Sequence, residues 1–296
     1  EKAQAVVTRL PTKPILISVA FPGAADFPHF DSLLPSYSEA PLPDGWLPKR
    51  NDLAAYFHTG GTTGLPKLAM HTHANQVSAA HYIKRTMHTS VPEVGINGMP
   101  IFHVAGAIVA GLGDIAAGVN AVLPTMDGFR CKEVIMRYWQ LVEHYGVAIG
   151  GGIPTSVAAI ARVPVGKSDV SSLRILLSGG APVPESVAND IARITGCQLY
   201  SSYGMTETVG TIAMPNVLLP RVPGSAGHVG GEVEVKVDAD SEEPGAVGEI
   251  CVRGPMVFQG YLGFDESPFD KGWLRTGDLG YMDSNNNLFI TGRAKD

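Results

Sequence analysis

Apolar and polar positions follow two different periods along this chain, and the change of period divides it into regions. Between residues 106 and 200, apolar stretches with a helical period alternate with short apolar runs flanked by turn residues. The pattern predicts helices over 106–117, 130–145, 154–162 and 184–195. It predicts a strand after each of these helices, at 119–123, 146–150, 173–177 and 197–200. Helices and strands that alternate at this spacing indicate a mostly parallel sheet with helices on its faces.

The regions on either side have other patterns. Upstream we expect short strands at 14–21 and 53–57, a long surface connection over 22–50, and a helix over 73–87. After about residue 216 the helical period is lost, and strands are predicted at 232–238 and 248–253, with a hairpin over 273–292. The predicted fold class is therefore α/β, a mostly parallel sheet layer with flanking helices, followed by a smaller antiparallel β subdomain.

Composition narrows the class of protein. Hydrophobic residues make up 45% of the 296 positions and charged residues 17%, which is enough apolar material for a sizeable core and excludes wholesale disorder. The net charge is −6 and no Lys/Arg tract stands out, so nucleic acid is not expected as a partner. No apolar run is long enough to predict a transmembrane segment. The chain shows no mark of an interface that would predict its oligomeric state.

Neither cysteines nor histidines predict a metal site. The cysteines are odd in number, far apart and in no CxxC pair: Cys131, Cys197 and Cys251. This usage indicates a reducing compartment, and we predict a cytoplasmic location. Several histidines lie in or beside the predicted helix over 73–87: His71, His73, His81 and His88. Because no carboxylate or cysteine joins them at ligand spacing, a metal site there is not favoured.

The strongest chemical signal is the segment TGGTTGLPK at residues 59–67, directly after the predicted strand at 53–57. Its glycines and threonines bring many backbone N–H groups and hydroxyls close to one point, and Lys67 adds a positive charge. This combination suits a triphosphate. It is not a Walker A loop, because the lysine follows a proline and no Ser or Thr comes next. The alternative, a flexible surface loop, is disfavoured by the preceding strand and the closing Pro-Lys pair.

A series of segments resembles, in order, the motifs of the adenylate-forming superfamily, which includes acyl-CoA synthetases, luciferases and adenylation domains of peptide synthetases. They are TGGTTGLPK (59–67), MPIFHVAG (99–106), LSGGAP (177–182), YSSYGMTE (200–207), LRTGDLG (274–280) and GRAKD (292–296). The resemblance covers residues 59–296, and the first and fourth segments are the most specific. Leu68 and the run His71-Thr72-His73 make the chain look most like a bacterial acyl-CoA synthetase of the fatty-acid–CoA ligase kind.

The resemblance implies a role for residues in each segment. The implied catalytic residues are Lys67, Thr206, Glu207 and His103. The implied nucleotide-binding residues are Thr59, Gly60, Gly61, Thr62, Thr63, Gly64, Gly180, Ala181, Pro182, Ser201, Tyr203, Asp278 and Arg293. Glu207 would hold Mg²⁺, which prefers carboxylate and phosphate oxygens, and Lys295 would lie at the hinge to a C-terminal domain.

Several of these assignments make physical sense residue by residue. Tyr203 offers a flat face on which adenine could stack, and the Asp278 carboxylate could accept hydrogen bonds from both ribose hydroxyls. Thr206 would contact the α-phosphate, and Arg293 would reach ribose or phosphate. His103 would line the acyl pocket or its gate, although a histidine beside a phenylalanine is more often a packed core residue.

The match departs from the family in places. Gly61 stands where the family usually carries Ser, which removes one hydroxyl donor to the phosphates. The segment between Tyr261 and Trp273 is shorter than usual. The chain lacks an initial Met, few residues precede the phosphate loop, and the end falls at the hinge, so we expect a fragment. The expected division is 1–216 for the nucleotide- and acyl-binding core, 217–291 for the β-rich subdomain and 292–296 for the hinge.

The resemblance implies an enzyme, an acid–thiol ligase that uses ATP, Mg²⁺ and CoA. A carboxylic acid would react with ATP to give an acyl-adenylate and pyrophosphate, and the acyl group would pass to CoA. Small or apolar residues near the motifs favour a fatty or aryl acid over an amino acid, and a fatty acid is our prediction. Alternatives are an adenylating enzyme with another acceptor, such as a carrier protein or an amine, and a binding module that has lost catalysis. The fragment alone is expected to have little or no activity.

Overall fold

The structure, a computed structural model, describes residues 2–12, 14–19, 27–59, 67–88, 92–241, 243 and 245–294. The chain divides into two compact units, Glu1–Pro48 and Lys49–Asp296. The elements found in the described part of the first unit are short and helical: α1 (Lys2–Val7), α2 (Phe30–Leu33), η1 (Leu34–Ser36) and η2 (Asp44–Trp46). Every candidate site residue lies in the second unit.

The strand predicted at 14–21 is wrong for the residues that the structure describes there. Ser18 makes only an isolated bridge to His29, and the side chain of Ile15 is 83% exposed. The apolar run PILISV has a strand-like composition, but within this unit the described residues offer it no neighbouring strand to complete a ladder. Composition alone therefore suggested an element that needs a partner to form.

The second unit is built on a parallel sheet whose neighbours pair in the order β4-β3-β5-β6-β7. Its strands are β3 (Glu93–Ile96), β4 (Val119–Val122), β5 (Val147–Gly152), β6 (Ile175–Gly179) and β7 (Leu199–Ser202). The chain adds β4 on one side of β3 and then β5, β6 and β7 on the other side, so the strand order reverses once, between β3 and β5. Such a reversal is typical of doubly wound α/β sheets. The predicted fold class is confirmed, and β3, which the pattern of residues did not predict, is the strand nearest that reversal.

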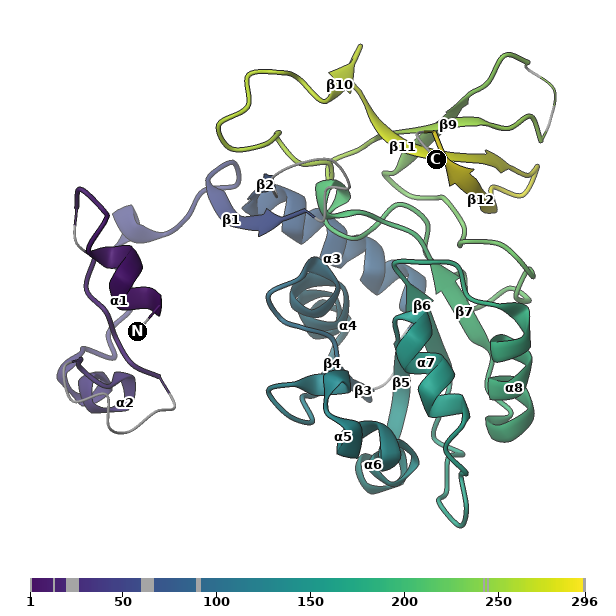
Figure 1. Cartoon of the computed structure of the whole chain (residues 1–296), viewed down its shortest axis with the longest axis horizontal. Helices are drawn as coiled ribbons and strands as arrows, with labels where there is room; N and C mark the ends of the chain where they lie inside the picture. The colour runs from purple at the N-terminus through teal and green to yellow at the C-terminus, as the bar shows by residue number, and fades with distance from the viewer. Residues whose placement is uncertain are drawn as a thin grey trace. The chain divides into compact units, whose positions relative to one another are not determined.

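Helices cover both faces of this sheet (Figure 1). Adjacent residues of β6 show the alternation: Ile175 packs in a core with α3 (His73–Met87), and Leu176 packs in a core with α6 (Tyr138–Tyr145). The remaining helical elements are the π-helix η3 (Ala105–Leu112), α4 (Gly113–Ala117), η4 (Gly128–Arg130), α5 (Lys132–Met136), α7 (Pro154–Ala161), α8 (Glu185–Thr195) and η5 (Thr206–Thr208). A strand with apolar residues on both faces is what a buried parallel sheet requires.

Two predicted helices are interrupted in the structure. The helix expected over 106–117 is a π-helix, η3, followed by the short α4. The helix expected over 130–145 is divided into α5 and α6 at Arg137, whose φ of −106° and ψ of 12° lie outside the helical region. At this break Trp139 donates a hydrogen bond from its Nε1 to the carbonyl of Val163 at 2.8 Å. A contact to residues far along the chain leaves no mark in a helical period.

Before the parallel sheet, β1 (Leu53–His58) and β2 (Leu68–Thr72) form an antiparallel pair. The glycine- and threonine-rich segment at 59–67 is the connection between these two strands. The sequence pattern predicted β1 but not β2, because the four residues after Leu68 are as much polar as apolar. The helix α3 follows β2 and matches its predicted bounds. It begins at a reciprocal capping box, in which Thr72 accepts a hydrogen bond from the backbone of Asn75.

The C-terminal part is an antiparallel sheet with the path β10-β11-β9-β8, and β12 pairs with β11. Its strands are β8 (Glu234–Asp238), β9 (Gly248–Arg253), β10 (Phe269–Asp270), β11 (Trp273–Met282) and β12 (Leu288–Arg293). The predicted hairpin over 273–292 is therefore confirmed. Ile250 and Val252 of β9 join the core that contains α3, so this sheet and the α/β layer share apolar packing.

Among the described residues, no helix is both long and apolar enough to cross a membrane. The predicted boundaries at residues 216 and 291 stay predictions, and the proposed hinge residue Lys295 lies outside the described residues.

Candidate active site

The candidate residues gather at one edge of the parallel sheet because several of them follow the carboxyl ends of its strands. His103 follows β3, Gly180–Pro182 follow β6, and Tyr203 follows β7. Since β3, β5, β6 and β7 run parallel, their carboxyl ends meet at the same edge. Ligands of open α/β sheets bind at this edge. The sheet thus brings together segments that are up to 100 residues apart in the sequence.

The hairpin of β1 and β2 holds the two ends of the phosphate-loop candidate. The backbone N–H of Thr59 donates to the carbonyl of Lys67 at 2.9 Å, so both residues stand at the mouth of the loop. Thr59 is 8% exposed. The predicted phosphate-binding residues between them, Gly60, Gly61, Thr62, Thr63 and Gly64, lie outside the described residues.

Lys67 lies against two aromatic rings. Its Nζ is 4.8 Å from the ring centroid of Tyr261 and 4.7 Å from that of Phe264. An ammonium over an aromatic face is attracted by the quadrupole of the ring. No carboxylate of the described residues pairs with Lys67, so its charge is available to an anion at the loop.

Thr206 and Glu207 stand in a short 3₁₀ turn, η5, after β7. Both are largely buried, with exposures of 9% and 6%. The hydroxyl of Tyr261 donates to Oε1 of Glu207 at 2.6 Å, and Nε2 of His71 lies 2.8 Å from the carbonyl oxygen of Thr206. Burial, and next the carboxylate of Glu207, raise the pKa of Tyr261, so its hydroxyl stays protonated and donates.

The Glu207 carboxylate meets a simple test as a Mg²⁺ ligand. The described residues contain no cluster of three or more His, Cys, Asp and Glu side chains that could hold a metal ion by themselves. Mg²⁺ is commonly bound in another way, through one or two carboxylates together with substrate phosphates. Oε2 of Glu207 has no hydrogen bond to any part of the chain that the structure describes, and so it fits the role.

Tyr203 and Asp278 are in direct contact across the two sheets. The Tyr203 hydroxyl donates to Oδ2 of Asp278 at 2.6 Å, and Nε of Arg293 lies 3.2 Å from Oδ1. Asp278 in β11 faces Arg293 in β12 in the strand register. Burial and the neighbouring Asp278 raise the pKa of Tyr203, which therefore remains a donor. A hydrogen bond and an ion pair thus join these three sequence-predicted nucleotide residues into one group.

His103 stands at the start of the π-helix η3. Its Nδ1 accepts a hydrogen bond from the backbone N–H of Ala105 at 3.1 Å, so the proton of the neutral ring is on Nε2. Burial, and next the nearby His58, lower the pKa of His103 and favour this neutral form. The ring of His58, at the end of β1, lies 6.1 Å from that of Phe102. The segment of His103 is thus beside the strand that leads into the phosphate loop.

The candidate adenine turn is open to solvent. Gly180, Ala181 and Pro182 are exposed, and Gly180 has a φ of +85°, which favours glycine. Ser201 in β7 pairs with Ser178 in β6, so it stands beside this turn. The hydroxyl of Ser178 is buried without a hydrogen-bond partner among the described residues.

Sequence reasoning missed residues that support the site. The sequence patterns give Tyr261 no role in the site, and they connect His71 with it only through the family resemblance. No pattern singles out Asn97, whose side-chain amide donates to the carbonyls of Gly106 at 2.9 Å and Ala110 at 2.8 Å, within η3. The only sequence signal for them was a polar residue beside an apolar run, which is too common to select a site.

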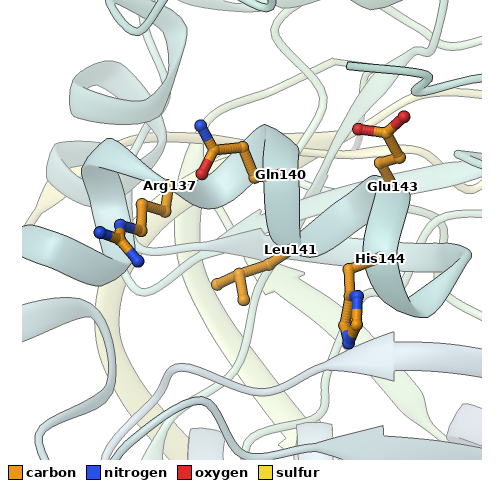
Figure 2. A pocket seen from close by; sticks show the side chains of 5 residues that line it. All are labelled: Arg137, Gln140, Leu141, Glu143 and His144. Carbon is orange, nitrogen blue, oxygen red and sulfur yellow. The ribbon is translucent and has the colours of Figure 1, made fainter.

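A depression elsewhere on the surface has no candidate residue in its lining. It lies along α6 and is lined by Arg137, Gln140, Leu141, Glu143 and His144 (Figure 2). The carboxyl end of α6 leads into the amino end of β5, the opposite end of that strand from the candidate residues. The depression therefore belongs to a different part of the surface from the site.

Known proteins resemble this chain over most of its length. It is 31% identical over 264 residues to a marinolic acid–CoA ligase of Pseudoalteromonas sp. (strain SANK 73390), covering 83% of this chain and 40% of the relative. It is 32% identical over 288 residues to 4-coumarate–CoA ligase 1 of Petroselinum crispum, covering 90% of this chain and 51% of the relative. The chain thus spans about half the length of these curated relatives or less.

Solved structures and a family profile agree with these relatives. The N-terminal domain of FACL13 from Mycobacterium tuberculosis superposes with a TM-score of 0.78 at 25% identity, over 99% of this chain and 72% of that one. The profile described as AMP-binding enzyme matches residues 6–262, which includes the phosphate loop and the Thr206–Glu207 turn. With this match over most of its length, the chain belongs to the AMP-binding enzyme family.

Proposed function

We propose that the protein containing this chain activates a carboxylic acid with ATP and transfers the acyl group to CoA. The observation that carries the proposal is the convergence of the nucleotide residues: Lys67, the Thr206–Glu207 turn, and the group formed by Tyr203 and Asp278 lie around one edge of the sheet. Family membership and the names of the relatives, which are CoA ligases, support it.

In the first step, an oxygen of the carboxylate forms a bond to the α-phosphorus of ATP. The bond from that phosphorus to the bridging oxygen breaks, and pyrophosphate leaves with the electron pair. In the second step, the thiolate of CoA forms a bond to the acyl carbon. The bond from that carbon to the phosphate oxygen breaks, and AMP leaves with the electron pair. In both steps the chain's own groups contribute mainly position and electrostatic stabilisation.

Each residue has a role that its geometry supports. Lys67 places a positive charge at the loop that faces the leaving phosphates, and the Thr206 hydroxyl donates to the α-phosphoryl oxygens. Glu207 would hold Mg²⁺ through Oε2, and the bound metal would neutralise charge on the phosphate oxygens. Asp278 accepts from the ribose hydroxyls; its oxygens keep free lone pairs after accepting from Tyr203 and pairing with Arg293.

The carboxylic acid would bind beside the neutral side chain of His103 and the small residues of η3. His103 carries its proton on Nε2, for which the described residues provide no hydrogen-bond partner, so this N–H is free to orient a carboxylate oxygen. Ala107 and Ala110 of η3 follow it along the chain. We propose an apolar acid, with a fatty acid first and an aryl acid second; the second choice follows the coumarate ligase among the relatives.

The free Cys131, Cys197 and Cys251 support the cytoplasmic location that we propose.

The test is ATP–pyrophosphate exchange by the whole protein, measured over a panel of fatty and aryl acids, with CoA consumption followed in parallel. We expect exchange that depends on the acid and is accompanied by loss of free CoA thiol. Exchange without CoA consumption would assign another acceptor. No exchange with any acid, together with tight binding of an acyl-adenylate analogue, would mean that the protein is a binding module and not an enzyme.

A further inference from the structure

The strand β2 begins directly after Lys67 and leads to His71, which contacts the Thr206–Glu207 turn. It pairs with β1 on one side and with residues 259–262 on the other, where Ala69 bridges Tyr261. On that second side the N–H of Met70 donates to the carbonyl of Gly260 at 3.0 Å, and the N–H of Leu262 to the carbonyl of Leu68 at 2.9 Å. β2 is therefore a central strand, and the paired segment that carries Tyr261 is held in register with it.

His71, in β2, is fully buried, with 0% of its surface exposed. Its Nε2 lies 2.8 Å from the carbonyl oxygen of Thr206, which can only accept, so the ring donates from Nε2. Its Nδ1 has no hydrogen-bond partner among the described residues. Burial lowers the pKa of His71 to about 4, so the ring is neutral near pH 7. The two nitrogens therefore differ: only Nε2 is connected to the site.

Tyr261 approaches the same turn from the paired segment. Its hydroxyl donates to Oε1 of Glu207 at 2.6 Å, and the N–H of Phe258 donates to the carbonyl of Glu207 at 2.9 Å. Together with His71, these contacts engage the Thr206 carbonyl, the Glu207 carbonyl and one oxygen of the Glu207 carboxylate. The face of the same Tyr261 ring is in contact with Lys67.

The turn needs this support because it is short and strained. η5 contains three residues, and it is followed by Val209, which has a φ of +54°. A β-branched residue in the left-handed region is unfavourable and persists where its surroundings hold it. Val209 is fully buried, so packing and the bonds from His71 and Tyr261 are available to hold the turn.

We propose that His71 and Tyr261 are positioning residues that hold the Thr206 hydroxyl and the Glu207 carboxylate in the geometry that Mg-ATP requires. This inference rests on the proposed function. Through β2 and its partner segment, the two residues also connect this turn to Lys67. Neither residue touches substrate; each acts on a group that does.

The first experiment uses Tyr261→Phe in the whole protein, a change that removes the hydroxyl and keeps the ring that contacts Lys67. Calorimetry measures the affinity for ATP with Mg²⁺ and with EDTA. We expect the affinity with Mg²⁺ to fall about tenfold, the scale of a hydrogen bond to a charged group. The affinity in EDTA should stay close to that of the wild type. Tyr56→Phe, on β1 with a half-exposed ring, is the matched control.

The second experiment exploits the difference between the nitrogens of His71. In His71→Gln the amide nitrogen can reach the position of Nε2, whereas in His71→Asn it reaches only that of Nδ1. We expect Gln to preserve most of the Mg-ATP affinity and exchange rate, and Asn to lower both about tenfold. His81→Gln and His81→Asn, at an exposed position of α3, are controls, and the melting temperature of each variant reports its folding.

The outcomes separate this inference from the proposed function. An active wild type with Tyr261→Phe and His71→Asn that equal it in Mg-ATP affinity and exchange overturns the inference alone. A loss that is equal with and without Mg²⁺, or equal for Gln and Asn, means a merely structural role and overturns it as well. A wild type without exchange overturns the proposed function, and the calorimetry still tests the inference. A wild type that does not bind Mg-ATP overturns both.

Discussion

At the scale of single residues, the carboxyl group of Asp114 in α4 is buried where its charged form is disfavoured. It is 4% exposed, and no hydrogen bond or ion pair reaches its carboxylate from any residue that the structure describes. Its Oδ2 lies so close to Gly95 in β3 that a Cβ there would be 2.9 Å away. Burial raises the pKa of Asp114 from 3.8 to about 7.

This shift predicts how stability depends on pH. Between the pKa of about 4 in the unfolded chain and that of about 7 in the folded chain, the folded state binds more protons, so stability falls as pH rises through this window. A pKa difference of about three units corresponds to about 4 kcal/mol in the free energy of unfolding. Asp114→Asn, which mimics the neutral form, should raise the urea midpoint at pH 8 and change it little at pH 4. An equal gain at both pH values would contradict the role of burial.

Lys67 is the second residue for which a single change is informative. Lys67→Ala removes the charge that we assign to the phosphates, and we expect KM for ATP to rise about tenfold or more, as for a lost charge-assisted bond. Because Lys67 lies at the mouth of a loop, the melting temperature should change by no more than a few degrees. Lys84→Ala, at an exposed position of α3, is the control. A large drop in melting temperature with unchanged KM would mean a structural role.

At the scale of elements, the π-helix η3 depends on one side chain outside it. Asn97 is 3% exposed and donates to two carbonyls of η3, those of Gly106 and Ala110. π-helical turns are rare and often mark functional sites, and here the element begins two residues after His103. The carbonyls that an α-helix would use are partly satisfied by Asn97 instead.

Asn97→Ala should therefore cost about 2–3 kcal/mol of stability, since one buried and one partly buried carbonyl lose their donor. It should also change the relative rates of ATP–pyrophosphate exchange for acids of different size, because η3 carries the small residues after His103. Urea unfolding and exchange over the acid panel measure the two effects. Asn120→Ala, exposed on β4, should change neither. Lost stability with an unchanged acid preference would separate η3 from the acyl site.

Elements differ in how far the sequence predicts them. The helix α3 was predicted with its observed bounds because its start is local: Thr72 and Asn75 cap it within one turn. The break at Arg137 and the π-helix were not predicted. Trp139 in α6 bonds to Val163, which is 24 residues away, and η3 is bonded by Asn97, which lies outside it. The strand predicted at 14–21 was wrong because a strand needs a partner as well as apolar residues.

At the scale of the whole molecule, the hydrogen bond between Tyr203 and Asp278 joins the end of the parallel sheet to the antiparallel one. We expect Tyr203→Phe and Asp278→Asn each to weaken ATP binding several-fold. The double variant should be weakened by less than the product of the two, because the Tyr203 hydroxyl acts through Asp278. Calorimetric affinities of the four proteins give this coupling directly. Independent effects that multiply would show that the bond does not position the ribose carboxylate.

The sequence by itself determined the fold class and the family, and it predicted the residue types of the candidate site. Helical period, strand alternation and the motifs at 59–67 and 200–207 are local patterns. Residues close together along the chain carry them, so they can be read from the sequence alone. Only the tertiary structure decided which residues hold the site together. Tyr261 stands 54 residues from Glu207, and His71 stands 135 from Thr206. Contacts across such distances come from strand pairing and burial, and these depend on the folded chain as a whole.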